Sequence, residues 1–125
     1  MKRKVLLACI PSSMPMYRYH IDPIAQIELE EAGNTYIRYF AGLGDIHRGE
    51  ILAAAFFEGY IDKIQQLKQM PFMHPLCNVY PFNDSNPSGY RSFRIGWFTV
   101  FYTVEDAWLT VWHVRSSKSD FTSIS

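Results

Sequence analysis

The fold is decided by the stretch Arg91-Ser92-Phe93-Arg94-Ile95-Gly96-Trp97-Phe98-Thr99-Val100-Phe101-Tyr102-Thr103-Val104-Glu105-Asp106, near the end of the chain. It contains two apolar runs separated by Gly96-Trp97, and a third run follows the break at Glu105-Asp106-Ala107. Breaks of two or three residues between such runs are typical of hairpins. The pattern therefore predicts three antiparallel strands: Tyr90–Ile95, Phe98–Val104 and Trp108–Arg115.

Two amphipathic helices are predicted upstream of these strands. Asp22 and Asp45 can each cap the free N–H groups at a helix start, and Pro23 suits the first helical position. Apolar positions spaced by three and four give the first helix this buried stripe: Ala25, Leu29, Ala32, Tyr36, Phe40 and Leu43. The second stripe, widened by two residues, ends before Pro71: Leu52, Phe56, Tyr60, Ile64 and Leu67, with Phe57 and Ile61. The short connection predicts an antiparallel helix hairpin.

The remaining segments complete an α+β fold. Met16–Ile21 alternates between apolar and polar residues, which predicts an N-terminal strand directly before the first helix. Val5–Ile10 and Leu76–Tyr80 are further candidate strands. The order predicts an N-terminal strand, an antiparallel helix hairpin packed on one sheet face, and a three-stranded antiparallel meander. We expect one domain, 1–125, in which residues 1–15 are an N-terminal extension that adds an edge strand or packs on the sheet.

The composition excludes several classes of protein. The 125 residues carry 12 basic and 12 acidic side chains, a balance that argues against strong free-standing binding to nucleic acid but permits a local basic patch. Two separated cysteines, Cys9 and Cys77, do not form a disulfide scaffold. Only four apolar residues precede Cys9, fewer than the 7–15 of an export signal. Because apolar runs of about 20 residues are also missing, we expect a cytoplasmic protein without a membrane span.

Basic residues recur at the ends of the predicted strands, which suggests a basic rim on the meander: Arg91, Arg94, Arg115 and Lys118. Arginine has a planar, permanently charged fork that grips phosphate oxygens in pairs. His113 lies two residues before Arg115, so the two side chains share one side of a strand, and histidine is suited to proton transfer. Simpler interpretations stay open: Arg94 and Arg115 as solvated strand residues, and His113 as a hydrogen-bonded strand histidine.

Other chemistry-bearing residues form weaker patterns. Three tryptophans fit core or hairpin packing and are also able to stack on bases: Trp97, Trp108 and Trp112. Apolar residues in the proline-rich loop suggest a contact surface for a partner: Met70, Phe72, Met73 and Phe82. His74 and Cys77 are three residues apart, but a second pair of metal ligands does not follow. We therefore expect neither a metal nor another cofactor.

The order of these segments resembles the RelE/ParE superfamily of toxins from bacterial type II toxin–antitoxin modules. The resemblance extends from about Met16 to Phe121. It is carried by four stretches in the family's order: Ile21-Asp22-Pro23-Ile24-Ala25, Ile64–Pro71, Arg91–Asp106 and Val114–Phe121. The third resembles the family's arginine–aliphatic–glycine turn, which is followed by a strand with an inward tyrosine and an acidic hairpin.

The resemblance implies a toxin that a cognate antitoxin wraps and neutralises. Some members cleave mRNA on the ribosome without a metal, and others poison DNA gyrase. By position, Arg94 matches the arginine that clamps the scissile phosphate, and Arg115 or Lys118 matches the cations of the closing strand and tail. Phe121 stands where several ribonuclease members have a proton-transferring tyrosine, so His113 is the nearest substitute. Ribosome-dependent mRNA cleavage is the first mechanism that we expect from the resemblance. The departure at Phe121 favours the two alternatives, gyrase poisoning and a noncatalytic interaction module.

Overall fold

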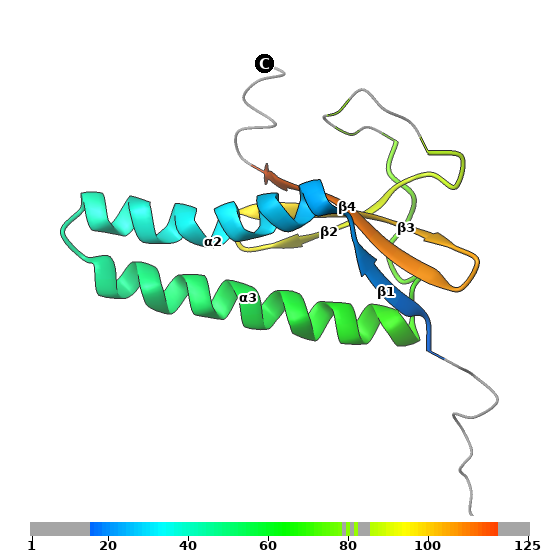
Figure 1. Ribbon diagram of the computed structural model, residues 1–125, viewed down its shortest axis with the longest axis horizontal. Coiled ribbons are helices and arrows are strands. Elements are labelled where there is room, and N and C mark those ends of the chain that lie inside the picture. Colours follow the sequence, from blue (N-terminus) through cyan, green and yellow to red (C-terminus); the bar gives the residue numbers. More distant parts are fainter. Residues whose placement is uncertain (1–15, 79, 81, 83–85, 118–125) are drawn as a thin grey trace, which may run out of the picture.

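The computed structural model describes residues 16–78, 80, 82 and 86–117 (Figure 1). Within these residues the elements follow one another in this order: β1 (Arg18–Ile21), α2 (Pro23–Gly42), α3 (Ile46–Gln69), β2 (Arg91–Ile95), β3 (Phe98–Glu105) and β4 (Trp108–Ser116). The predicted α+β order of strand, helix hairpin and meander is therefore confirmed. The candidate strand Val5–Ile10 and the extension 1–15 lie outside the described residues.

Both helices begin at the predicted aspartates. The Asp22 carboxylate accepts a hydrogen bond from the Ile24 N–H at 3.0 Å, and the Asp45 carboxylate accepts one from the Arg48 N–H at 3.2 Å. These bonds satisfy N–H groups that have no partner within the first helical turn. Between the helices, Gly44 has a φ of +80°, a left-handed conformation that glycine adopts without steric cost. Among the described residues, no helix combines the length and apolarity needed to cross a membrane.

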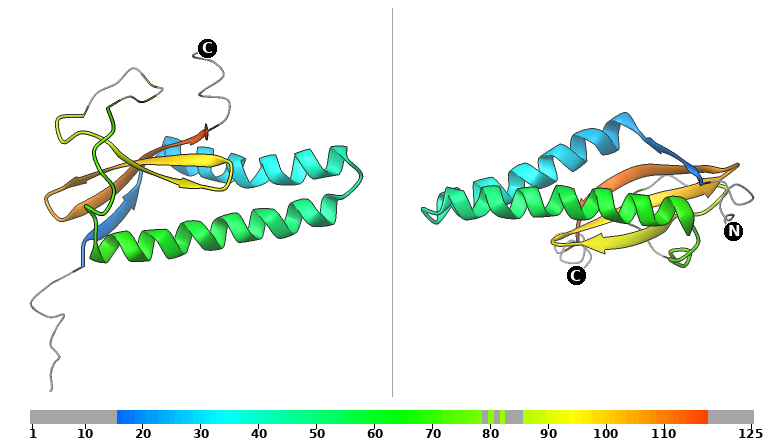
Figure 2. Two further views of the ribbon diagram at one scale, coloured as in Figure 1. Left: turned by 180° about the vertical axis from the view of Figure 1, so that it is seen from behind. Right: turned by 90° about the horizontal axis from the view of Figure 1, so that it is seen from below.

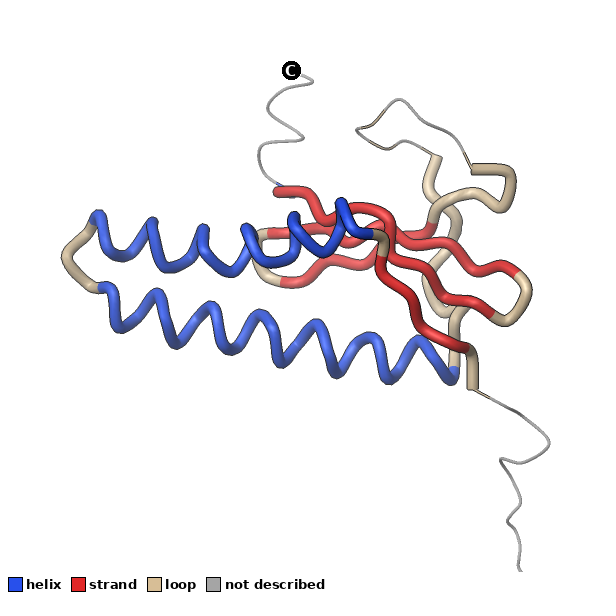
Figure 3. Tube along the Cα trace, in the orientation of Figure 1, coloured by secondary structure: helices blue, strands red, loops and turns tan. Residues whose placement is uncertain are grey.

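The sheet has the strand order β1-β4-β3-β2 (Figure 3). β2, β3 and β4 form the predicted antiparallel meander, and β1 pairs with β4 in parallel. At the β3–β4 turn both Asp106 and Ala107 have positive φ, 52° and 67°, as a two-residue primed hairpin turn requires. The parallel partner places the end of β1 beside the middle of β4, so α2 starts next to the sheet.

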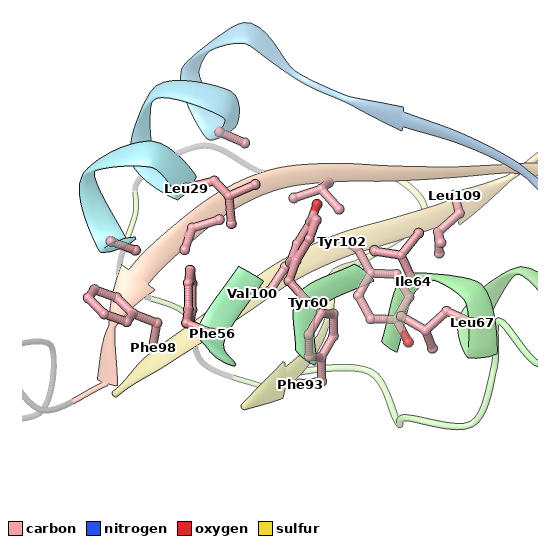
Figure 4. Packing of buried hydrophobic residues seen from close by; sticks show 14 of the residues in the cluster. Leu29, Phe56, Tyr60, Ile64, Leu67, Phe93, Phe98, Val100, Tyr102 and Leu109 are labelled. Atoms are coloured by element: carbon pink, nitrogen blue, oxygen red, sulfur yellow. The ribbon is translucent and has the colours of Figure 1, made fainter. Parts of the chain in front are cut away.

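The two helices α2 and α3 cover one face of the sheet, and within the described residues neither of them lies on the other face, which we call the face without helices (Figure 2). The core lies between these layers, where Val100, Tyr102 and Val111 are fully buried (Figure 4). The helix hairpin is tight because Gly49 faces the backbone of the other helix: a Cβ there would lie 2.8 Å from the Tyr36 carbonyl oxygen. The predicted core stripes are buried where the sheet covers the hairpin.

Three sequence expectations fail in particular places. Leu43 is 64% exposed because the end of the hairpin projects past the sheet (Figure 1), and Ile61 is 56% exposed because it points away from the sheet. Leu76–Tyr80 does not form the candidate strand in its described residues. The ladder there is a single bridge between Leu76 and Arg91. Pro75 and Pro81 flank this stretch, and proline cannot donate to a ladder.

Candidate functional site

The sheet face without helices brings together Arg94, Arg115 and His113. The register pairs Arg94 with Thr99 on β3, and Thr99 with Arg115 on β4. The side chains of Arg94, Thr99 and Arg115 therefore form a row across one face of the sheet. His113 pairs with Phe101 one step along the same face. Neighbouring strands lie about 4.8 Å apart, so the backbones of the two arginines are separated by about 10 Å across the row.

Arg94 is the exposed member of this row. Its Nε donates to the Gly96 carbonyl oxygen at 3.4 Å, a long hydrogen bond that leaves most of the guanidinium in solvent. Among the described residues Arg94 has no carboxylate partner, so it is able to contact an anion without first breaking an ion pair with one of them.

Arg115 is held by an acidic residue from α2. Its Nε donates to Glu28 Oε2 at 3.1 Å, while Glu28 Oε1 accepts the backbone N–H of Val114 at 2.8 Å. β1 pairs with β4 as far as Val111, and among the described strands none continues along this edge of β4 beyond that point. Glu28 thus caps that edge and neutralises much of the Arg115 charge at the same time.

His113 lies beneath an aromatic ring from the proline-rich loop. The Phe82 ring stacks on the imidazole at a centroid distance of 4.0 Å and also contacts Phe101 at 5.1 Å. His113 Nδ1 lies 3.4 Å from Arg115 Nη2 and 3.7 Å from Glu28 Oε1, and its side chain is 13% exposed. A general base has to come within hydrogen-bond reach of the substrate proton. The stacked ring and these neighbours restrict that approach.

The apolar residues of the proline-rich loop, which the sequence suggested as one contact surface, lie in two different environments. Met70 and Phe72 are more than half exposed, as a contact surface requires. Phe82 instead packs against the sheet, because Phe101 offers it an apolar site on the face without helices. Arg115 completes this site, with its guanidinium 5.5 Å from the Phe82 ring centroid.

The residues of the predicted basic rim do not all lie on one face of the sheet. Arg91 projects to the opposite face from Arg94, since the two differ by an odd number of strand positions. There its guanidinium lies 4.9 Å from the centre of the Phe72 ring and donates to the His74 carbonyl oxygen. Arg91 therefore anchors the loop after α3. Lys118 and Phe121 lie outside the described residues, so the role expected for Lys118 stays a prediction.

Three tyrosines at the helix–sheet boundary have raised pKa values because burial disfavours their ionised form. Tyr19 and Tyr60 share a hydrogen bond of 2.6 Å between their hydroxyl groups, and burial is the largest cause of the raised pKa of each. Burial raises the pKa of Tyr102 to about 12, and its hydroxyl donates to the Pro71 carbonyl oxygen at 3.1 Å. Tyr102 is thus the inward tyrosine that the resemblance implied.

The tryptophans occupy three different environments. Trp97 stacks on Tyr36 at 4.4 Å and closes the β2–β3 turn against α2. Trp112 Nε1 donates to Thr103 Oγ1 at 2.9 Å on the face without helices. Trp108 is 40% exposed, with the Arg18 guanidinium 5.6 Å from its ring centroid. Packing accounts for Trp97 and Trp112, whereas Trp108 is accessible for stacking.

The described residues contain no cluster of three His, Cys, Asp or Glu side chains able to hold a metal ion. Cys77 Sγ instead donates to Ser92 Oγ at 3.3 Å. Sequence reasoning did not place Glu28 or Phe82 beside His113. Glu28 lies off the buried stripe of its helix, and helical spacing alone does not indicate that it reaches β4. Phe82 lies in a loop, where periodicity gives no orientation.

The sequence matches no protein-family model and no curated protein. Among solved structures, it is similar to a chain of the "Chromosomal ParDE TA system from P. aeruginosa", with a TM-score of 0.54. The two sequences are 12% identical, and the match covers 81% of this chain and 96% of that chain. At this identity the likeness concerns the fold. The chain has a RelE/ParE-like α+β fold.

Proposed function

We propose that this protein is the toxin of a type II toxin–antitoxin module and that it arrests growth by binding a protein target, DNA gyrase. The fold supports the toxin role, because a structure of a ParDE system contains a chain of the same architecture. In this proposal the protein acts in the cytoplasm and a cognate antitoxin holds it inactive until release. The proposal requires an exposed binding surface and no proton-transferring residue.

The observation that carries this choice of mechanism is the covered state of His113. Its ring stacks under Phe82, and its Nδ1 faces Arg115 and Glu28. Attack of a ribose 2′-hydroxyl on the adjacent phosphate needs a group that accepts a proton at the substrate. A histidine in this position is a poor base for that reaction, whereas binding to a protein target makes no such demand.

A second candidate function is ribosome-dependent mRNA cleavage without a metal. The row of Arg94, Thr99 and Arg115 across three strands favours it, because two guanidinium groups on one face suit the charge of a phosphate. In this alternative Arg94 and Arg115 clamp the phosphate, and His113 or Lys118 moves the protons. Arg115 has to exchange Glu28 for the phosphate.

Expression of the chain alone, under an inducible promoter in a bacterial host, tests these functions. Gyrase poisoning predicts growth arrest with induction of the SOS response, intact bulk mRNA and loss of supercoiling activity by purified gyrase. The double variant Arg94→Ala/Arg115→Ala should keep the arrest in that case, because the proposal assigns no chemistry to these cations. The control Arg38→Ala removes an exposed arginine that pairs with Glu31 on α2, away from this face.

Each contrary outcome has a definite meaning. Arrest that disappears in the double variant but not in Arg38→Ala, together with fragmented mRNA, supports the ribonuclease and overturns gyrase poisoning. A soluble, folded protein that causes no arrest overturns the toxin role and leaves a noncatalytic interaction module that keeps the fold.

A further inference from the structure

Three consecutive residues of β4 surround one carboxylate from α2, the helix that packs against this strand. The Val114 N–H donates to Glu28 Oε1 at 2.8 Å, and Arg115 Nε donates to Glu28 Oε2 at 3.1 Å. His113 Nδ1 lies 3.7 Å from Glu28 Oε1. Both oxygens of this carboxylate are therefore bound by groups of β4. We call the Val114 N–H and the Arg115 guanidinium the anion site.

The anion site is accessible from solvent. The side chains of Arg115 and Glu28 are 31% and 23% exposed, so the core does not enclose either of them. The buried stripe of α2 fixes the helix to the sheet, and its residues Ala25, Leu29 and Ala32 are almost completely removed from solvent. A partly exposed ion pair contributes little to stability. Glu28 therefore matters more for the charge of this part of the sheet than for the attachment of α2.

The donors of the anion site are of the kind that binds phosphate in proteins. Backbone N–H groups and arginine side chains supply many of the contacts to nucleic-acid phosphates. A guanidinium binds carboxylate and phosphate oxygens in the same way, because both anions present two acceptor oxygens to its planar fork. The Glu28 carboxylate thus occupies the place that one phosphate group would take.

Glu28 also lowers the positive charge beside this place. Arg94 lies in the same row across the sheet, about 10 Å from Arg115. The two arginines and Glu28 leave a net charge of +1, whereas the two arginines alone would carry +2. Each phosphate that a protein neutralises adds to its affinity for nucleic acid. With Glu28 in place, Arg94 is the one of these two arginines that remains for an outside anion.

An outside ligand has to compete with a carboxylate of the same chain. The packing of α2 holds Glu28 beside the anion site, so its effective concentration there is on the order of millimolar or higher. Non-specific binding of nucleic acid to a whole protein surface has dissociation constants of about 1–100 μM, and one phosphate contact supplies only a part of that affinity. A single phosphate contact is therefore too weak to displace Glu28.

We propose that Glu28 is an internal anion that fills the anion site and so excludes single-stranded nucleic acid from the face without helices. The excluded ligand is a phosphodiester group, which the Val114 N–H and Arg115 would bind with Arg94 beside them. This inference goes beyond the gyrase proposal and does not depend on it, because it concerns what this face rejects. Its test uses purified protein and RNA, so its failure is distinct from a failure of gyrase poisoning.

Fluorescence anisotropy with a labelled single-stranded RNA of about 12 nucleotides tests the proposal at several salt concentrations. Glu28→Ala should bind this RNA about tenfold more tightly than the wild type, because the internal competitor is gone. The slope of log K against log salt concentration should become steeper by about 0.7, the value for one further phosphate contact on a single strand. Glu28→Gln frees the guanidinium but keeps an acceptor for the Val114 N–H, so its gain should be smaller.

Glu31→Ala is the charge-matched control, because it also removes one carboxylate from α2 and frees an arginine partner, Arg38. It raises the net charge by the same one unit but leaves the anion site filled, so its affinity should stay within about twofold of the wild type. The double variant Glu28→Ala/Arg115→Ala removes both partners and should return to the wild-type affinity. Circular dichroism checks the fold of each variant.

Three results overturn the proposal. The first is that folded Glu28→Ala and Glu28→Gln bind the RNA no more tightly than the wild type does. The second is an equal gain in Glu31→Ala, since net charge alone then explains the affinity. The third is a gain that persists in Glu28→Ala/Arg115→Ala, because the RNA then binds without the anion site. If Glu28→Ala does not fold, Glu28→Gln decides in the same way, because it keeps the acceptor for the β4 backbone.

Discussion

The two faces of the sheet are built on different physical principles. On the helix-covered face, Phe93, Val100 and Val114 are almost fully removed from solvent, and each adds a favourable burial term of about 1.5–3 kcal/mol. On the other face, the alternating positions include Arg94 and His113, which individual hydrogen bonds and ring contacts hold. On the helix-covered face, the burial of many apolar side chains adds up, so the loss of a single contact matters less. On the other face, each hydrogen bond or ring contact depends on one partner residue, so a single substitution changes the arrangement more easily.

The close contact of Gly49 on α3 with the backbone of α2 gives the largest expected effect of a substitution on stability. In Gly49→Ala the new Cβ would lie 2.8 Å from both the Tyr36 carbonyl oxygen and Ile37 Cα. Backbone atoms do not rotate away, so the helices have to separate and the covered face loses contacts. We expect a loss of about 3 kcal/mol in the free energy of unfolding, the upper part of the range for overpacking. Urea denaturation measures it as a lower midpoint at an unchanged slope.

Gly42→Ala is the matched control, because a Cβ at that position meets nothing within 4 Å. Alanine in place of glycine in a helix should raise stability by up to about 1 kcal/mol. Equal effects of the two substitutions on stability would contradict the close packing of Gly49 against α2.

The covered face follows from the sequence to a large extent. Two aspartates, two apolar stripes and two short breaks in the meander predicted the helix starts, the hairpin and the antiparallel strands, because each is a local signal with a fixed period. The prediction that the buried stripe of the first helix reaches Leu43 was wrong. Helical spacing shows which side of a helix is apolar but not where the sheet beneath it ends.

The face without helices was only partly predictable. Strand alternation correctly put His113 and Arg115 on one face, since that relation is local. The ion pair between Arg115 and Glu28 joins residues 87 positions apart, and the parallel pairing of β1 with β4 creates it. The antiparallel pattern of the other strands gives no signal for that pairing. The covered state of His113 likewise depends on a loop residue, Phe82.

The Tyr102 hydroxyl provides an intermediate test on the covered face. Tyr102→Phe leaves the Pro71 carbonyl oxygen without its donor, which should cost about 1–2 kcal/mol near pH 8. Burial raises the pKa of Tyr102 in the folded protein to about 12, above the ordinary value of 10.0. The neutral phenol therefore stabilises the fold fully below pH 10, and this contribution is lost as the pH rises towards 12.

The stability difference between wild type and Tyr102→Phe should accordingly shrink between about pH 10 and pH 12. Urea denaturation at each pH measures it. The control Tyr39→Phe removes an exposed hydroxyl and should differ little from the wild type. A difference that is constant with pH would mean that Tyr102 ionises as easily in the folded chain as in the unfolded one.

Glu28 should give the smallest effect and tests whether pairing holds the other face. Glu28→Ala removes the acceptor of the Val114 N–H and the partner of Arg115, which should cost about 1–1.5 kcal/mol. Glu28→Gln keeps an amide oxygen that can accept the Val114 N–H and loses only the charge. Because a partly exposed ion pair contributes little, this variant should lose only about half as much stability as Glu28→Ala. Glu31→Ala, which breaks an exposed pair with Arg38, is the control and should change stability by less than about 0.5 kcal/mol. Equal losses for alanine and glutamine would mean that the backbone cap contributes nothing, and that charge alone connects α2 to this edge of the sheet.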